Sequence, residues 1–341
     1  MDPYISVIVT AYNRRRYLPE ALRSLERQTL DKEKFEVIVV KNFEDPASDE
    51  IIRRNGWRWV YSDERLYGRF ILAGAEEARG EVVTLLNDDD MYAPERLRAV
   101  EEAFKAIRGL AYFHNEQIVV GEDGKPLEGK KDEGIGGPDL FIEDPSLACR
   151  HITSRFANDS SIAISSWVIH SLRPYLRHIK NEFDLAIAVG VMVIGGKILL
   201  SGKKLTMWRA HQGSFFTYIL DAFGARKGYW KGTIAKYAKN NAVLASDTLT
   251  ALKFLGNHPC RPYVERIEIV QRLEASSAPD WALSDRPRSS PLDLFKVTRL
   301  ARGGIMEVDL KYLATLALDS LVSWTPSVIR DAWWMLRWSL G

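Results

Sequence analysis

Cysteine is nearly absent from this chain, with only Cys149 and Cys260 among 341 residues. Two cysteines so far apart in sequence argue against a disulfide-rich scaffold and against a zinc knuckle, which needs a Cys-x-x-Cys pair. The formal net charge is only +2, so no overall field draws the chain to nucleic acid. We therefore expect a reducing, cytoplasmic compartment, no nucleic-acid partner, and binding sites that depend on local clusters of residues.

The chain also lacks the apolar runs that enter membranes. An apolar strand begins at Ile5, and the few residues before it hold neither the basic region nor the apolar core of a signal peptide. We therefore expect that the chain is not exported. The 46% hydrophobic and 27% charged composition is ordinary for an α/β protein with a substantial core and one large or two ordinary domains.

Apolar strands alternate with amphipathic helices along the first part of the chain. This alternation predicts a Rossmann-like α/β domain with a mostly parallel, doubly wound sheet. Ligands of such sheets bind beyond the carboxyl ends of the strands. The expected strands are 5–10, 35–40, 57–61 and 82–86, and the expected helices are 17–30, 48–55 and 67–79.

The pattern changes after residue 110. A hairpin is expected over 110–125, a strand or strand-to-helix element over 160–169, a helix from about Asn181, and a last strand over 197–200. Helical periodicity then dominates, interrupted by a stretch rich in Pro, Ser and Arg. The expected organisation is a catalytic domain over 1–215, a helical extension over 216–270, a linker over 271–291, and amphipathic helices over 292–341.

Polar residues follow three of the expected strands, at 10–13, 41–45 and 87–90. Because the carboxyl ends of parallel strands share one edge of a sheet, these clusters predict a single site. The last cluster holds three consecutive aspartates, and such neighbouring like charges need a positive partner. Mg²⁺ or Mn²⁺ suits hard oxygen ligands and can bridge the diphosphate of a nucleotide sugar. The alternative is a solvated acidic turn before the helix that begins near Pro94.

Three runs of the sequence carry a resemblance to a known family. They are the run ISVIVTAYN over 5–13, the run ARGEVVTLLNDDD over 78–90, and the run PERL over 94–97. Together they resemble the family 2 glycosyltransferases of the GT-A fold, over roughly residues 4 to 216. The resemblance implies a nucleotide-sugar donor, a divalent metal, and a base and ribose cradled at the end of the first strand.

The family's Asp-x-Asp motif maps best onto Asn87-Asp88-Asp89. The resemblance then makes Asp89 the principal metal ligand and Asp88 a contact of the donor sugar or ribose. Asp90 stays in the metal set because Asp88-Asp89-Asp90 also satisfies the motif. Two departures concern donor recognition: Lys41 stands where an acidic residue is common, and Ile71-Leu72 replaces the usual Arg-Asn. Arg69 is the residue expected to reach the donor instead, and its alternative role is that of a surface arginine.

An acidic element and a basic element complete the predicted site. Asn181-Glu182-Phe183-Asp184-Leu185 resembles the family's Glu-Asp-x-x-Leu element, and alignment on Leu185 makes Glu182 the base that takes the acceptor proton, with Asp184 as second candidate. The alternative is that both acids only favour a helix N-terminus. Trp208 to Ser214 resembles the Arg-x-His element that closes over the donor. The donor-binding set is Thr10, Ala11, Tyr12, Asn13, Asn42, Arg69, Asn87, Asp88 and Arg209, and the metal set is Asp89, Asp90 and His211.

The last fifty residues are rich in aromatic side chains. Residues 312–329 hold few charges, and Trp333, Trp334, Leu336 and Trp338 follow. Because Asp319 and Pro326 interrupt the apolar pattern, interfacial helices fit better than a spanning helix of ~20 residues. The alternative is a helical lid or a dimer surface. Cations that could meet anionic headgroups are Lys296, Arg299, Arg302 and Lys311.

The predicted function is an inverting, metal-dependent transfer of a sugar to a lipid-linked or glycan acceptor at the cytoplasmic face of a membrane, or in the cytoplasm. Mannose from GDP-mannose is the predicted donor, by resemblance to membrane-associated mannosyl- and glucosyltransferases. A sugar nucleotidyltransferase is an alternative, but its glycine-rich phosphate loop is missing from Ala11 to Arg16. A noncatalytic scaffold of the same fold is the other alternative.

Overall fold

The structure is a computed structural model. It describes residues 2–127, 137–152, 156–211, 230–278, 310–325 and 329–333, and single positions or pairs between 283 and 299. Several predictions lie outside these residues, namely the end of the Arg-x-His element at 212–214, most of the linker after 278, Arg302, Trp334, Leu336 and Trp338.

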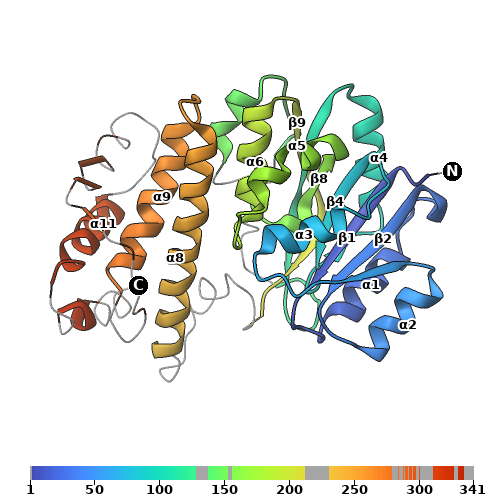
Figure 1. Cartoon of the computed structure of the whole chain (residues 1–341), viewed down its shortest axis with the longest axis horizontal. Helices are drawn as coiled ribbons and strands as arrows, with labels where there is room; N and C mark the ends of the chain where they lie inside the picture. The colour runs from blue at the N-terminus through green and yellow to red at the C-terminus, as the bar shows by residue number, and fades with distance from the viewer. Residues whose placement is uncertain are drawn as a thin grey trace. The chain divides into compact units, whose positions relative to one another are not determined.

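The chain divides into two compact units, Met1–Ala210 and His211–Gly341. The first unit holds the sheet, and the second is helical wherever it has regular structure in the described residues (Figure 1). Neither Cys149 nor Cys260 is a free thiol. The small number of cysteines is therefore no argument for a reducing compartment.

Within the described residues, nine strands form one mixed sheet in the order β3-β2-β1-β4-β8-β6-β9-β5, with β7 paired to β9. β1 pairs in parallel with β2 and β4, and β8 lies antiparallel between β4 and β6. The mostly parallel α/β sheet is thus confirmed. The strands are β1 (Ile5–Ala11), β2 (Phe35–Lys41), β3 (Arg58–Tyr61), β4 (Val82–Asn87), β5 (Met91–Tyr92), β6 (Leu110–Val120), β7 (Leu140–Ile142), β8 (Ile162–Ser165) and β9 (Lys197–Arg209).

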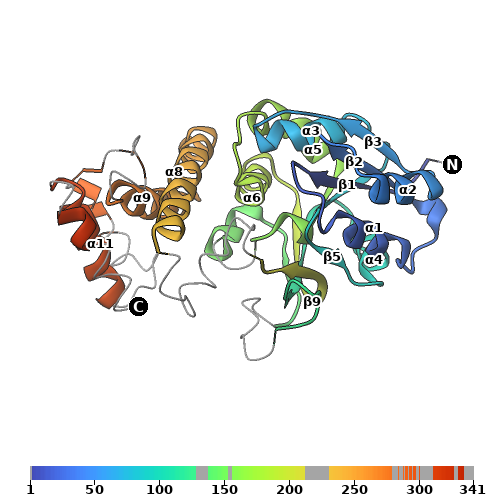
Figure 2. The ribbon, with the colours of Figure 1, turned by 90° about the horizontal axis from the view of Figure 1, so that it is seen from below.

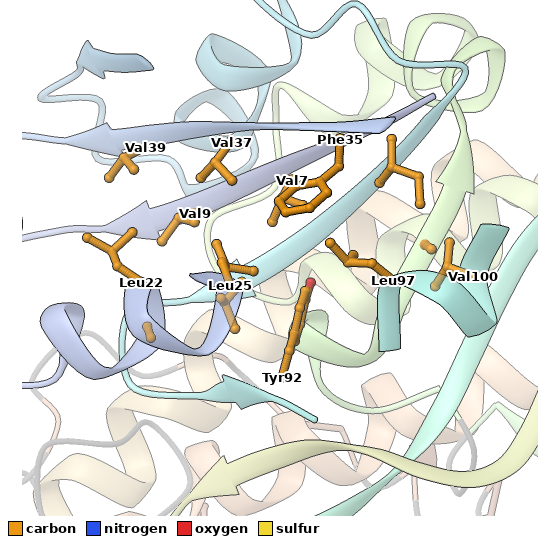
Figure 3. Close-up of a cluster of buried hydrophobic side chains, with 14 of the residues drawn as sticks. Val7, Val9, Leu22, Leu25, Phe35, Val37, Val39, Tyr92, Leu97 and Val100 are labelled. Carbon is orange, nitrogen blue, oxygen red and sulfur yellow. The ribbon is translucent and has the colours of Figure 1, made fainter. Parts of the chain in front are cut away.

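Helices cover both faces of the parallel strands, with α1 and α4 on one face and α3 on the other (Figure 2). Alternate residues of β1 and β2, such as Val7 and Val37, meet Leu22 and Leu25 of α1 and Leu97 of α4 in the main apolar cluster (Figure 3). Both faces are buried, which explains why these strands read as continuous apolar runs. The helices of this unit are α1 (Leu18–Glu26), α2 (Pro46–Arg54), α3 (Tyr67–Ala75), α4 (Arg96–Ala106), α5 (Ser166–Leu176) and α6 (Phe183–Ile194).

A glycine sets how closely α3 approaches the sheet. A Cβ atom on Gly74 would lie 2.7 Å from Cγ2 of Ile8 and 2.7 Å from Cγ2 of Val40. Such contacts are much shorter than van der Waals separation, so only glycine allows this packing. At its other end α3 begins with Tyr67, whose hydroxyl reaches the end of β4.

The strand expected from residue 110 is β6, and the turn after it closes as expected for a hairpin: Val120 pairs antiparallel with Pro126, and the Leu127 N–H donates to the Val119 carbonyl at 3.0 Å. One expected element differs from the structure. β9 runs on to Arg209 instead of ending at Leu200, because its second half pairs with β6 and β5. The Lys203-Lys204 pair hid this continuation, since it reads as a polar break.

The second unit contains α8 (Trp230–Leu255), α9 (Arg261–Ser276) and α11 (Leu310–Val322). α9 packs against both of the other helices. Arg272 of α9 makes ion pairs with Glu268 at 2.6 Å and with Asp293 at 2.5 Å. Residues 271–276, expected to open the linker, are the end of α9. No helix in the described part of the chain is long and apolar enough to cross a membrane.

Candidate active site

Strand register brings the ends of β1, β2 and β4 to one edge of the sheet. Thr10 lies opposite Asn87, and Ala11 lies opposite Lys41. The Asn87 side-chain oxygen accepts hydrogen bonds from the Thr10 hydroxyl at 3.0 Å and from the Tyr67 hydroxyl at 2.7 Å. These bonds fix the orientation of Asn87 before any ligand arrives.

The loop after β1 is tied to the loop after β2 through two asparagines. Asn13 has a positive φ of 57°, a conformation that asparagine tolerates better than most residues. Its backbone N–H donates to Asn42 Oδ1 at 2.8 Å, and Asn42 Nδ2 donates back to Asn13 Oδ1 at 2.9 Å. The neighbouring Tyr12 is 39% exposed and meets Phe70 edge to face at 5.5 Å. An aromatic face is thereby held at the strand edge.

Arg14, on the same loop, binds two of the three consecutive aspartates. Its Nε lies 3.0 Å from both carboxylate oxygens of Asp88, its Nη2 also contacts Asp88, and its Nη1 lies 2.8 Å from Asp89. Burial alone would lower the pKa of Arg14, but the hydrogen bond and charge of Asp88 raise it. Burial raises the pKa of Asp88 to about 7, although Arg14 opposes this shift. We call Asp88 and Asp89 the Arg14-bound pair.

Asp90 points away from this pair and into the protein. Its carboxylate accepts hydrogen bonds from the Ser160 hydroxyl at 2.6 Å and from the Arg209 backbone N–H at 2.9 Å. Burial, with the charge of Asp89, raises the pKa of Asp90 to about 8. Ser160 also accepts a hydrogen bond from the Asn87 backbone N–H at 3.0 Å, so one serine holds the aspartate run at two points.

Two more acids lie near Asp90. Asp184 Oδ2 accepts a hydrogen bond from the Asn158 backbone N–H at 2.9 Å, and Oδ1 accepts one from its own helix at Leu185. Burial raises the pKa of Asp184, and burial with the charge of Asp184 raises that of Asp159. In the described structure, Asp159 Oδ1 has no hydrogen-bond partner. We call Asp90, Asp159 and Asp184 the interior acid cluster.

Glu182 stands apart from this cluster. It is the N-cap of α6, directly before Phe183, and its side chain makes no capping hydrogen bond. It is half-buried, so part of its surface reaches solvent. The other predicted base, Asp184, accepts hydrogen bonds from the Asn158 N–H and from the Leu185 N–H in the first turn of α6.

Arg209 is fully buried at the end of β9. Its guanidinium donates to the Asp89 carbonyl at 2.9 Å, to the Glu122 carbonyl at 2.7 Å and to the Glu20 carboxylate at 2.6 Å. It also lies 4.5 Å from the ring centroid of Tyr17. These contacts anchor the backbone that carries Asp89.

Some predicted residues are not brought to the aspartate run. Arg69 donates to the carbonyl of Arg177, the residue that ends α5, at 3.3 Å. It also lies 3.7 Å from Glu64. Lys41 is buried, pairs with Asp49 at 2.8 Å, and donates to the Phe43 carbonyl. His211, a predicted metal ligand, is buried two residues after Arg209, and its role stays a prediction. The strand-edge donor set is therefore Thr10 to Asn13, Asn42, Asn87 and Asp88.

The carboxylates of this edge are hard oxygen ligands of the kind that Mg²⁺ and Mn²⁺ prefer, and in this structure they are engaged by the protein's own donors. Throughout the part of the chain that the structure describes, no three His, Cys, Asp or Glu side chains are grouped so that they could hold a metal ion. The carboxylates of Asp88 and Asp89 face Arg14, and that of Asp90 is bound to Ser160 and Arg209.

The sequence-based prediction missed Arg14, Tyr67 and Asp159. Arg14 was one of three consecutive arginines with nothing to distinguish them. Asp159 lies in a short 3-10 turn, where no periodicity operates. The signal available for it was the polar run Asn158-Asp159-Ser160-Ser161 directly before the apolar strand β8.

Comparison with known proteins places the sheet domain in a family. Residues 6–128 match the family model for glycosyl transferase family 2. A Pseudomonas aeruginosa relative, an undecaprenyl-phosphate 4-deoxy-4-formamido-L-arabinose transferase, is 35% identical over 116 residues, which are 30% of this chain and 34% of the relative. The chain spans 38% and 28% of the length of the first two curated relatives it matches.

Two solved structures share the fold. S. aureus TarS 1-349 in complex with UDP-GlcNAc superposes with a TM-score of 0.53 at 14% identity, covering 98% of this chain and 91% of that one. The mannosyltransferase PcManGT from Pyrobaculum calidifontis, in complex with GDP-Man and Mn²⁺, gives a TM-score of 0.53 at 14% identity, covering 100% and 87%. The chain therefore carries a glycosyl transferase family 2 domain over residues 6–128, and its fold is the GT-A fold of these two solved structures.

Proposed function

We propose that this protein transfers a sugar from a nucleotide-diphosphate donor to a lipid-linked or glycan acceptor, with inversion. The observation that carries the proposal is the meeting of Thr10 to Asn13 with Asn87 to Asp89 at one sheet edge, within the family 2 domain. Nucleotide ligands of doubly wound sheets bind at such edges. Tyr12 offers a face for the base, and the asparagines offer donors and acceptors for the ribose.

We propose GDP-mannose as the donor, supported by PcManGT, whose structure holds GDP-Man and Mn²⁺. TarS, which superposes equally well, was solved with UDP-GlcNAc. At the end of β2, Lys41 is buried and Asn42 is hydrogen-bonded to Asn13, so this strand end offers no free acid to the nucleotide base. Selection of the base must therefore depend on other groups, such as the exposed Tyr12.

We propose Glu182 as the base that removes the acceptor proton while the nucleoside diphosphate leaves from the opposite face of the sugar. This assignment is supported by the resemblance of residues 181–185 to the family's Glu-Asp-x-x-Leu element and by the half-buried place of the Glu182 side chain at the start of α6. Asp184 instead holds the Asn158 turn and the start of α6, so we assign it a positioning role. Arg209, whose donors all meet protein acceptors, positions Asp89 in the same way.

A divalent cation, Mn²⁺ or Mg²⁺, would supply charge stabilisation for the leaving diphosphate. Of the predicted ligands, we propose Asp89 as the principal one. Asp90 would need to exchange its bonds to Ser160 and Arg209. His211, which is buried two residues after Arg209, stays a proposed ligand. Binding therefore requires side chains to rearrange from the arrangement described above.

We further propose that the second unit meets a membrane surface, which would bring a lipid-linked acceptor to the enzyme. Leu318 and Leu321 of α11 are 42% and 63% exposed, and Trp324 just after it is 65% exposed. Phe295, which is 68% exposed, adjoins Lys296. Apolar and cationic side chains together favour anionic lipid surfaces. Co-flotation with anionic but not neutral vesicles, lost in a Leu321→Asp/Trp324→Asp variant, would support this.

The experiment that tests the transferase proposal has two stages. Thermal shifts with GDP, UDP, dTDP and CMP, each with and without Mn²⁺, identify the base, because a ligand of the folded state raises the melting temperature. Release of nucleoside diphosphate from the matching sugar nucleotides is then measured with acceptor lipids. One preferred donor is expected. If no nucleotide raises the melting temperature and no sugar nucleotide releases its nucleoside diphosphate, the proposal is refuted.

A Glu182→Gln variant tests the base. It should bind donor like the unmodified protein and lose at least ~100-fold in transfer, as expected for removing a general base. Full transfer activity would assign the base elsewhere, and Asp184→Asn would be the next variant to measure.

A further inference from the structure

We propose that Arg14 is a built-in counter-ion of the donor site, which competes with a divalent cation for the carboxylates of Asp88 and Asp89. This inference rests on the proposed function only in taking a divalent cation as the physiological competitor. It makes Arg14 a positioning residue whose departure accompanies metal binding.

The contacts of Arg14 are those of a cation shared between two anions. Three of its guanidinium nitrogens are used, with Nε at 3.0 Å from each oxygen of Asp88 and Nη1 at 2.8 Å from Asp89 Oδ2. The two aspartate side chains are only 3% and 10% exposed, whereas that of Arg14 is 32% exposed. The carboxylates are therefore fixed inside the site, and the arginine approaches them from its open side.

Arg14 and a divalent cation would compete for the lone pairs of these oxygens and repel each other. Mg²⁺ requires near-octahedral oxygen ligands at ~2.0–2.1 Å, and a guanidinium already donating to those oxygens blocks the approach and repels the ion. Two ionised carboxylates carry two negative charges. A divalent ion neutralises both of these charges, whereas one arginine neutralises one. Exchange of Arg14 for the ion is thus electrostatically favourable, but it costs the arginine's hydrogen bonds.

The chain before Arg14 gives it a defined pivot. Asn13 has its φ at 57° and is held by two hydrogen bonds to Asn42. Rotation of the Arg14 side chain therefore need not move β1. Once displaced, a guanidinium at the mouth of the site can bind oxygens of a diphosphate in pairs.

The test is Mn²⁺ binding by the full-length, nucleotide-free protein, followed through the electron paramagnetic resonance signal of free Mn²⁺. Arg14→Met should bind Mn²⁺ at least ~10-fold more tightly than the unmodified protein, because the competing positive charge is removed. Arg14→Lys, which keeps a charge without the planar fork, should lie between them. Arg15→Met is the matched control, since Arg15 donates instead to the Glu44 carbonyl, and its affinity should be unchanged.

Several outcomes decide the matter. Equal or weaker Mn²⁺ binding by Arg14→Met, with an unchanged circular dichroism spectrum, would overturn the proposal. Should Arg14→Met fail to fold, the same comparison is made with Arg14→Lys alone. Tighter binding that persists in an Arg14→Met/Asp89→Asn double variant would also overturn it, because the ion would then bind elsewhere. Since no sugar nucleotide or turnover enters these measurements, failure of the transferase proposal would be seen separately.

Discussion

The Arg14-bound pair and the interior acid cluster are both made of buried carboxyl groups, but they are stabilised in different ways. Asp88 and Asp89 have a cation, Arg14, which approaches from the open side of the site. Asp90 and Asp184 instead accept hydrogen bonds from the Ser160 hydroxyl and from three backbone N–H groups. Burial raises the pKa values of these two acids and of Asp159. An exchangeable cation suits a ligand site, whereas fixed hydrogen bonds and retained protons suit a scaffold.

The difference is produced by backbone direction over very few residues. Asp89 and Asp90 are adjacent, yet one reaches Arg14 and the other reaches Ser160, because the chain turns between β4 and β5. Carboxylates of consecutive residues can thus point in different directions and contact different partners, which lowers their mutual repulsion.

Asp89→Ala should have the largest effect, a loss of donor turnover of at least ~100-fold, because the group proposed to meet the cation is removed. Metal-dependent donor binding should be lost with it. Nucleoside diphosphate release and calorimetric titration measure the two losses. Glu33→Gln, a change at an exposed acid of the same unit, is the control. Unchanged donor binding by Asp89→Ala would remove Asp89 from the site.

Arg209→Met should cost ~2–4 kcal/mol of unfolding free energy, because two buried carbonyls and the Glu20 carboxylate lose their donor. Urea unfolding measures this cost. If Arg209 served the donor phosphate alone, stability would stay constant and the donor KM would rise. A stable variant with weakened donor binding would therefore contradict the positioning role.

Asp184→Ala should cost less, ~1–3 kcal/mol, because the Asn158 and Leu185 N–H groups lose an acceptor in a buried place. Asp184→Asn keeps an acceptor and should recover part of the loss. Urea unfolding of both variants gives the comparison. A loss of transfer in Asp184→Asn at full stability would instead indicate a role in catalysis.

Asp159→Asn should change how stability depends on pH, and the sign of this change follows from linkage. The folded pKa of Asp159 is raised by burial and by Asp184, while the unfolded value is ~3.9. The favourable contribution of its proton is complete below ~pH 3.9 and falls as pH rises toward the folded pKa, by up to ~1.4 kcal/mol per pH unit. Asp159→Asn should therefore flatten this slope. Melting temperatures from pH 5 to 8 measure it, and an identical slope in both proteins would mean that Asp159 is ionised throughout.

The parts of the fold that sequence could predict are those with a single physical cause. β1, β2 and β4 are buried on both faces and therefore appear as apolar runs. Polar residues at their carboxyl ends then locate the site. The helix that begins at Phe183 could be predicted equally well, because the acidic residues Glu182 and Asp184 indicate its N-terminus.

What sequence could not predict depends on loop conformation and on partners distant in the chain. Arg14, which binds Asp88, follows Asn13, whose positive φ is not visible in the sequence. The next two arginines have the same side chain but bind other residues, Arg15 the Glu44 carbonyl and Arg16 the Glu122 carboxylate. Arg209 resembles a phosphate ligand by motif, but the extension of β9 buries it. The sequence thus identified the segments that form the site, but only the structure shows which partners their side chains contact.

The tight contact of Gly74 with Ile8 and Val40 has a consequence for mutational tolerance. A methyl group there must push α3 outward, and α3 carries Tyr67, whose hydroxyl holds Asn87 at the sheet edge. Random mutagenesis followed by selection for activity should thus find position 74 intolerant, although it lies two helical turns from Tyr67 and contacts no proposed substrate group. Laboratory evolution of donor preference would have to leave this position untouched while varying the loops.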